Sequence, residues 1–163
     1  MLLSAQSQWG IGHQHSIKEA GLVVEWGKGA HEVSRACVTL DLGGILTGET
    51  GKPGYRVSYQ RCFFSPVSHW NDGSEVSIFY GPGIGGGAVR DHNGERGSIA
   101  FLSGTVGLHF LFPDSPITVS AGICAELGLH RERVSGGHSI LRFYQNGLRR
   151  VWMPELHFIY HFR

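Results

Sequence analysis

The chain has 163 residues, with 25 glycines, nine Phe, five Tyr, four Trp and only six Pro, and this composition argues against a disordered or fibrous chain. A formal net charge of +1 gives no general electrostatic reason to expect a nucleic-acid partner. No window approaches the roughly 18 apolar residues of a membrane helix, and the mean hydropathy of −0.08 would ordinarily indicate a soluble protein.

The first five residues, 1–5, are expected to be the end of a secretory signal peptide, because a leucine-rich stretch and a small residue precede a polar start at Gln6. An ordinary N-terminus is the alternative. Residues 6–163 are predicted to form a single domain.

The three cysteines, Cys37, Cys62 and Cys124, have no C-x-x-C spacing, so neither a zinc ribbon nor a thioredoxin-like site is supported. Whether Cys37 and Cys62 pair stays open.

Apolar residues alternate with polar or small ones through most of the chain, which is the pattern of β-strands. The clearest stretch follows Pro116, where the apolar series from Ile117 to Leu129 opposes the series from Thr118 to His130. This alternation predicts eight strands and no helix, over residues 8–14, 22–27, 34–43, 55–63, 76–85, 98–112, 117–130 and 152–162. Short links with turn residues predict antiparallel neighbours, and closure into an up-and-down barrel removes exposed edges.

The two faces of these strands differ in a way that decides the class of barrel. The polar side is rich in Gly, Ser and Thr with isolated charges and almost no Lys, which is typical of a narrow, filled lumen rather than a water-facing surface. The sequence therefore predicts an all-β, eight-stranded antiparallel up-and-down transmembrane β-barrel with a filled lumen. Aromatic residues near strand ends are predicted to form a girdle at headgroup depth: Trp9, Trp26, Tyr80, Trp152, Tyr160 and Phe162. A soluble β-sandwich or lipocalin-like ligand-binding barrel is the alternative.

Several segments resemble the small eight-stranded outer-membrane barrels of Gram-negative bacteria, of the OmpA and OmpX type. The resemblance runs from about residue 21 to residue 163 and rests on Phe79–Gly83, Val106–Phe112, Ala125–Leu129 and the closing strand. It implies location in the outer membrane. It also implies that the barrel assembly machinery recognises the last strand, through Leu156, Phe158, Tyr160 and Phe162. Arg163 departs from the family pattern, because it follows the expected terminal aromatic residue.

Strand parity places both termini at the periplasmic side, with short turns there and longer loops outside. The outer loops are then expected at 47–54, 91–97 and 131–150, whereas 65–74 is long for a periplasmic turn. Asn146-Gly147 is a hairpin signal, so the last two strands are expected to continue above the membrane as a ribbon. Alternatively, 139–145 is a true strand and the N-terminal strand is not.

Charged residues on the lumen side require partners, and we predict that they form one polar network. Its members are Glu25, Arg35, Asp41, Arg56, Glu126, Glu155 and His157. Three further histidines, His109, His130 and His161, are also expected to point inward. A metal site is a less favoured alternative, because no tight spacing gathers these residues, and no cofactor is expected.

The expected function is therefore non-enzymatic, either structural or surface-binding through the outer loops. A lipid-modifying outer-membrane enzyme is the alternative, but the pairs His15-Ser16 and His138-Ser139 are adjacent and so point to opposite faces of a strand. The expected partners are outer-membrane lipid, the barrel assembly machinery and a protein partner in an envelope complex, and no nucleic acid. Trp70, in the long 65–74 turn, is a candidate contact for such a partner, and a place in the aromatic girdle is the favoured alternative for it.

Overall fold

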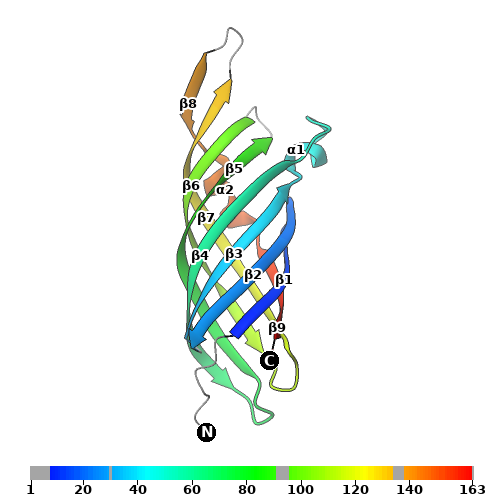
Figure 1. Ribbon diagram of the computed structural model, residues 1–163, viewed down its shortest axis with the longest axis vertical. Coiled ribbons are helices and arrows are strands. Elements are labelled where there is room, and N and C mark those ends of the chain that lie inside the picture. Colours follow the sequence, from blue (N-terminus) through cyan, green and yellow to red (C-terminus); the bar gives the residue numbers. More distant parts are fainter. Residues whose placement is uncertain (1–7, 30, 91–95, 134–137, 163) are drawn as a thin grey trace.

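The computed structural model describes residues 8–29, 31–90, 96–133 and 138–162, and it is an elongated β-barrel (Figure 1). The segment predicted as a signal-peptide remnant, 1–5, lies outside the described residues. The strands are β1 (Gln8–His15), β2 (Glu19–Gly29), β3 (Glu32–Asp41), β4 (Gly54–His69), β5 (Glu75–Arg90), β6 (Arg96–Leu111), β7 (Ile117–Arg133), β8 (Ser139–Phe143) and β9 (Glu155–Phe162). Three short helices are α1 (Gly43–Leu46), α2 (Asn146–Arg149) and the 3₁₀ turn η1 (Arg150–Trp152).

The strands close into an eight-stranded antiparallel barrel in sequence order, as predicted. Each strand from β1 to β7 pairs with the next one, β7 pairs with β9, and β9 pairs with β1. We call the end at which β1 begins and β9 ends the terminal end, and the opposite end the loop end. Closure explains how strands of up to 17 residues avoid exposed edges.

The eighth strand of the barrel wall is broken into two pieces, β8 and β9. β8 pairs with residues 129–133 of β7, and β9 pairs with residues 117–122 of the same strand. Between them, residues 144–154 leave the wall and carry α2 and η1; we call this stretch the inward segment. The prediction of one continuous last strand over 152–162 is therefore wrong at its start, and the prediction of no helix is wrong. The stretch that begins at Ser139 and the N-terminal stretch are both strands, so they are not alternatives.

The predicted hairpin turn at Asn146-Gly147 is also wrong, because these two residues begin α2 and are buried. Tyr144 is fully buried, and its N–H donates a hydrogen bond of 2.8 Å to the carbonyl of Gly128. A Cβ atom on Gly147 would lie 2.7 Å from the Glu126 carbonyl, so only glycine allows this close approach. Tertiary contacts with β7 thus override the local turn signal.

The rim of the barrel is uneven, because β1 and β9 have 8 residues each whereas β4, β5 and β6 have 16. A ribbon of β7 and β8 projects from the loop end in Figure 1. The first half of the long turn expected at 65–74 is strand, since β4 continues to His69, and β5 begins directly after it at Glu75. The remaining link is closed by the Trp70 N–H, which bonds the Ser74 carbonyl, and by Gly73 at φ +86°.

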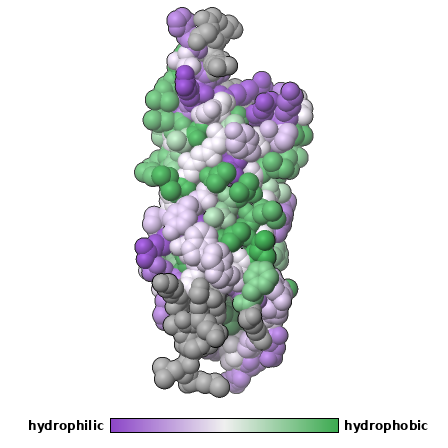
Figure 2. Space-filling model, in the orientation of Figure 1, coloured by the Kyte–Doolittle hydropathy of each residue, from purple (hydrophilic) through white to green (hydrophobic). Residues whose placement is uncertain are grey.

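Large apolar side chains cover the outside of the barrel, while charged side chains are buried inside it. Leu22, Val38, Leu102 and Leu127 are each more than half exposed, whereas Arg35 is completely buried. Figure 2 shows hydrophobic residues in green around the middle of the molecule and hydrophilic residues mostly towards its two ends. Small apolar clusters inside include Cys62, Phe64 and Phe79. All three cysteines are buried and free, so Cys37 and Cys62 do not pair.

Gly107 and Gly122 face each other across β6 and β7 and let Phe79 lie flat against the inner wall. A Cβ atom on Gly107 would lie 2.6 Å from the Phe79 ring and 2.3 Å from the Ala121 carbonyl, and one on Gly122 would lie 2.8 Å from the ring. Part of the high glycine content is thus required by a narrow lumen filled with large side chains. No helix in the described part of the chain is both long and apolar enough to cross a membrane.

Candidate functional site: the lumen charges and the barrel surface

Nearer the terminal end, Arg35 is held inside the lumen by Glu25 and His157; we call these three residues the lower cluster. The Arg35 Nε and Nη2 atoms donate hydrogen bonds of 3.1 and 2.7 Å to one carboxylate oxygen of Glu25. Its Nη1 lies 3.2 Å from Nδ1 of His157, and its guanidinium lies 5.5 Å from the centre of the Phe79 ring. All donor nitrogens of this buried cation therefore have a partner, as a buried charge requires.

Nearer the loop end, two arginines and three glutamates form the upper cluster: Glu19, Arg56, Glu126, Arg150 and Glu155. Arg150 donates hydrogen bonds of 2.5 and 2.8 Å to the two carboxylate oxygens of Glu19 and one of 2.7 Å to Glu155. Its Nε lies 3.1 Å from Glu126. Arg56 donates a hydrogen bond to Glu126, and its Nη1 lies 3.3 Å from Glu19. The five side chains are at most 5% exposed.

The upper cluster joins distant parts of the chain. Glu19 begins β2, Glu126 lies in β7, Glu155 begins β9, and Arg150 belongs to the inward segment. Arg150 is thus the cation that fixes the inward segment inside the lumen. Removing one partner from a buried ion pair typically costs about 3–5 kcal/mol, because the remaining charge stays buried without compensation. Two arginines face three carboxylates in this cluster, so loss of either arginine would increase the excess of buried carboxylates over arginines.

The seven residues predicted as one network lie in three places. Glu25, Arg35 and His157 form the lower cluster, and Arg56, Glu126 and Glu155 belong to the upper one. Asp41 is buried at the end of β3, where its Oδ1 accepts a 2.9 Å hydrogen bond from the Gly43 N–H at the start of α1. Six of the seven residues therefore fall into two ion-paired clusters, and Asp41 lies beside the start of α1.

Sequence reasoning missed Glu19 and Arg150. Glu19 lies on the same face of β2 as Val23 and Glu25, both of which are buried. Because side chains on one face recur at every second residue, continuing this series towards the N-terminus predicts that Glu19 also points inward. Arg150 carries no such signal, because it lies on a helical turn between two strand pieces and was placed in an outer loop. Its burial follows from the inward segment, which depends on contacts with β7.

The four histidines expected inside the barrel make separate contacts there. His109 Nδ1 lies 2.9 Å from Ser120 Oγ, and His161 Nε2 lies 2.9 Å from Thr118 Oγ1. His130 packs edge-on against Tyr144 with ring centres 6.4 Å apart, and His157 belongs to the lower cluster. No group of three or more possible metal ligands occurs among the residues that the structure describes.

His109 and Ser120 face each other across β6 and β7 and form a histidine–serine contact. Adjacent His-Ser pairs in the sequence do not predict it, because the two residues lie on different strands. Ser120 is 1% exposed, and the His109 ring packs on Phe64 at 4.7 Å. Within the described ranges, no carboxylate forms a hydrogen bond with His109 that could orient it as in a catalytic triad. The contact therefore fills the lumen and satisfies two buried polar groups. Ser16, of the pair His15-Ser16, instead accepts a 3.1 Å hydrogen bond from the Glu19 N–H.

Aromatic residues gather outside the barrel near the terminal end. Trp9 and Trp26 stack with ring centres 5.8 Å apart, and Tyr160 packs on Phe162 at 5.4 Å. Tyr80 packs on Phe63 at 5.8 Å. Trp152, which is also a predicted girdle residue, lies on η1 and not on a strand. It is 84% exposed.

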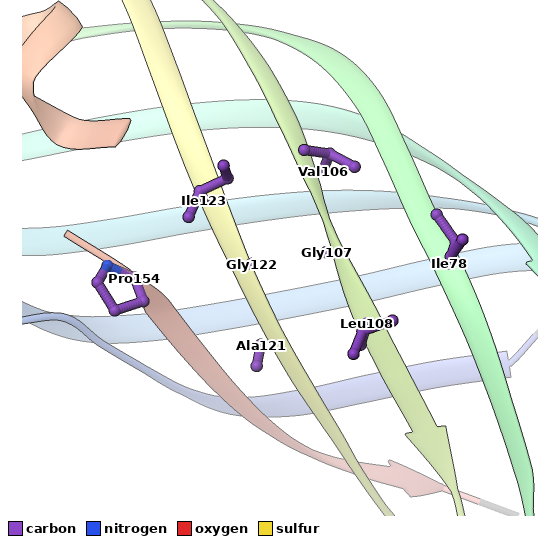
Figure 3. A pocket seen from close by; sticks show the side chains of 8 residues that line it. All are labelled: Ile78, Val106, Gly107, Leu108, Ala121, Gly122, Ile123 and Pro154. Carbon is purple, nitrogen blue, oxygen red and sulfur yellow. The ribbon is translucent and has the colours of Figure 1, made fainter. Parts of the chain in front are cut away.

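The outer wall has a shallow apolar hollow of about 440 Å³ over β5, β6 and β7, with Pro154 at its edge (Figure 3). Its floor is formed by the backbone of Gly107 and Gly122 and by the small side chain of Ala121. Ile78, Val106, Leu108 and Ile123 form its sides. The hollow contains no acid, base or nucleophile, so it offers an apolar surface and no chemistry.

Comparisons with known proteins identify no family. No protein-family model matches the chain, and no curated protein matches it. Among solved structures, a major outer membrane protein from Thermus thermophilus is similar, with a TM-score of 0.45 and 13% sequence identity. The similarity covers 95% of this chain and 99% of that chain.

Proposed function

We propose that this protein is an integral outer-membrane β-barrel with a plugged lumen, without enzymatic activity, and that it acts as a structural or surface-binding protein through its outer loops. The observation that carries the proposal is the inverted arrangement of the two faces. Leu102, in the middle of β6, is 63% exposed, whereas Arg35, Arg56 and Arg150 are buried in the lumen. A soluble lipocalin-like barrel needs large apolar residues inside and polar residues outside, which is the opposite arrangement.

The exposed apolar surface is too continuous for a protein surrounded by water. Monomeric soluble proteins rarely expose apolar patches larger than a few hundred Å². Here large apolar side chains are exposed on neighbouring strands and also on a distant part of the wall: Val38 and Leu40 on β3, Tyr55 and Val57 on β4, and Ile123, Leu127 and Leu129 on β7. A lipid bilayer covers such a band at no cost, because its hydrocarbon core is equally apolar.

The outer-membrane assignment and the assembly machinery as a partner are supported by the last strand. Leu156, Phe158, Tyr160 and Phe162 of β9 are 40–57% exposed and lie on the outward face. A terminal strand with alternating outward apolar residues is the expected signal for outer-membrane barrel assembly. Both ends of the barrel sequence lie at the terminal end, which we assign to the periplasm. The β7–β8 ribbon would then project from the cell, and it is the surface we propose for binding a protein partner.

A pair of substitutions at equally exposed leucines tests the membrane assignment. Leu102 on the barrel wall and Leu141 on the projecting ribbon are both 63% exposed. We expect Leu102→Arg to lower the free energy of unfolding in vesicles by about 2–4 kcal/mol, because arginine would face the middle of the bilayer. Leu141→Arg should change it by less than about 0.5 kcal/mol. The measurement is urea unfolding in phosphatidylcholine vesicles, with heat-modifiable migration on a gel as the assay for the folded barrel.

Equal, small effects of the two substitutions would contradict the proposal, as would a wild-type protein that stays monodisperse without detergent. Altered lipid composition of membranes after expression would instead favour the alternative of a lipid-modifying enzyme.

A further inference from the structure

Three exposed arginines, Arg90, Arg96 and Arg131, lie on the outward face at the loop end of three adjacent strands; we call them the arginine cluster. Arg90 of β5 and Arg96 of β6 are direct partners across the sheet. Ser98, two residues after Arg96 on the same face, is the partner of Arg131 on β7. Arg96 and Arg131 are therefore diagonal neighbours, within reach of a common ligand for long side chains.

Each of these arginines ends an outward series of apolar or small residues on its strand. On β5 the series that contains Ile84 ends at Arg90, and on β7 the series that contains Leu127 and Leu129 ends at Arg131. On β6 the outward positions run from Leu102 through Ala100 and Ser98 to Arg96. The cluster thus lies between the apolar band and the loop end of these strands.

The cluster has few negative partners in the described part of the chain. Arg96 donates a 3.1 Å hydrogen bond to the Glu49 carbonyl and lies 3.9 Å from the Glu49 carboxylate. No ion pair of Arg90 or Arg131 occurs among the described residues. Asp91 and Glu95 belong to the β5–β6 loop outside them. Like charges directly opposite each other on a sheet are destabilising, so an anion shared by Arg90 and Arg96 would stabilise this pair.

We propose that the arginine cluster binds the phosphate of an anionic lipid headgroup. Guanidinium groups bind phosphate oxygens through paired hydrogen bonds, and basic residues beside a membrane attract anionic lipids. The lipid source is favoured over free phosphate because the apolar band continues directly below the cluster and can hold the acyl chains of the same molecule. The inference rests on the proposed membrane location, because only a bilayer around the apolar band brings headgroups to this level.

The test is native mass spectrometry of the purified barrel in a neutral detergent, titrated with phosphatidylglycerol or with phosphatidylcholine. We expect the wild-type protein to bind phosphatidylglycerol at least tenfold more tightly. The triple variant Arg90→Gln/Arg96→Gln/Arg131→Gln should lose at least tenfold in this affinity, since each basic residue near the headgroups contributes roughly a fivefold factor. Arg61→Gln is the matched control, because Arg61 is an exposed arginine paired with Glu32 and lies towards the terminal end.

Two further experiments are needed. The first distinguishes a lipid phosphate from free phosphate, and the second distinguishes failure of this inference from failure of the proposed function. Inorganic phosphate at millimolar concentration should not displace phosphatidylglycerol; if it does so, the site is one for free anions and the lipid assignment is wrong. Wild-type protein and triple variant should insert equally into pure phosphatidylcholine vesicles. Insertion without any preference for phosphatidylglycerol would overturn the inference while leaving the membrane assignment intact, whereas failure to insert would overturn the proposed function itself.

Discussion

Arg150 connects the inward segment with three carboxylates from three different strands. We expect Arg150→Met to lower the free energy of unfolding by about 3–5 kcal/mol. Glu155 would lose the arginine that it contacts, and Glu19 and Glu126 would keep Arg56 alone of their two arginine partners. The measurement is urea unfolding of the detergent-solubilised barrel, followed by the loss of the faster-migrating folded band on a gel.

Arg149→Met is the matched control for this prediction, because Arg149 precedes Arg150 in the chain but is exposed. It should change the unfolding free energy by less than about 1 kcal/mol. Adding Glu19→Gln to Arg150→Met should recover part of the loss, since it removes one uncompensated charge. Equal stability of the Arg150 and Arg149 variants would mean that the ion pairs of the upper cluster contribute nothing to the fold.

The glycines on β6 provide a second comparison between single residues. A Cβ atom on Gly107 would lie 2.3 Å from a carbonyl oxygen and 2.6 Å from the Phe79 ring, whereas one on Gly104 would meet nothing within 4 Å. We expect Gly107→Ala to destabilise the barrel by about 1–3 kcal/mol through overcrowding, and Gly104→Ala to be neutral or slightly stabilising. The same unfolding assay measures both, and comparable effects at the two positions would contradict the close packing of Phe79 on the wall.

Among the elements, the β7–β8 ribbon should be separable from the barrel. All residues of β8 are exposed, and its ladder partners are confined to residues 129–133 of β7. We expect replacement of residues 132–140 by an Asn-Gly turn to leave the unfolding free energy within about 1 kcal/mol of the wild type. Among the described residues, the change removes the ladder pairs of Glu132 with Ile140 and of Arg133 with Ser139, and the surface ion pair of Glu132 and Arg142, all of them on the projecting ribbon. Unfolding in detergent checks this, and a larger loss would show that the ribbon supports the barrel wall.

The elements also show where sequence patterns predict structure and where they fail. The alternation from Ile117 to His130 predicts β7 correctly, because one face meets the exterior and the other the lumen along the whole strand. The last strand was predicted as continuous from Trp152, but β9 begins at Glu155. The residues before it fold inward because Tyr144 and Arg150 form hydrogen bonds in the lumen. The alternation of apolar and polar residues along the chain does not predict such contacts between distant residues.

For the molecule as a whole, the filled lumen predicts that the protein does not form an open pore. Arg35, Phe79, Tyr144 and His157 are among the largest fully buried side chains. Arg35, Phe79 and His157 fill the lumen around the lower cluster, and Tyr144 fills it nearer the loop end. We expect no stable single-channel conductance in planar phosphatidylcholine bilayers. Heat-modifiable migration of protein recovered from the phosphatidylcholine vesicles that deliver it to the bilayer would verify that it had inserted. Reproducible conductance steps from the inserted protein would contradict a filled lumen.

The sequence by itself determined the class of the fold and the direction in which its faces point. Side-chain alternation is a local consequence of strand geometry, so it predicts the barrel, the outward apolar residues and the inward position of residues such as Glu25 and Arg56. The tertiary structure alone decided that the eighth strand is broken, that Arg150 enters the lumen, and that the charges divide into two clusters. These features depend on contacts between residues up to 131 positions apart, between Arg150 and Glu19, and such contacts arise only when the barrel closes.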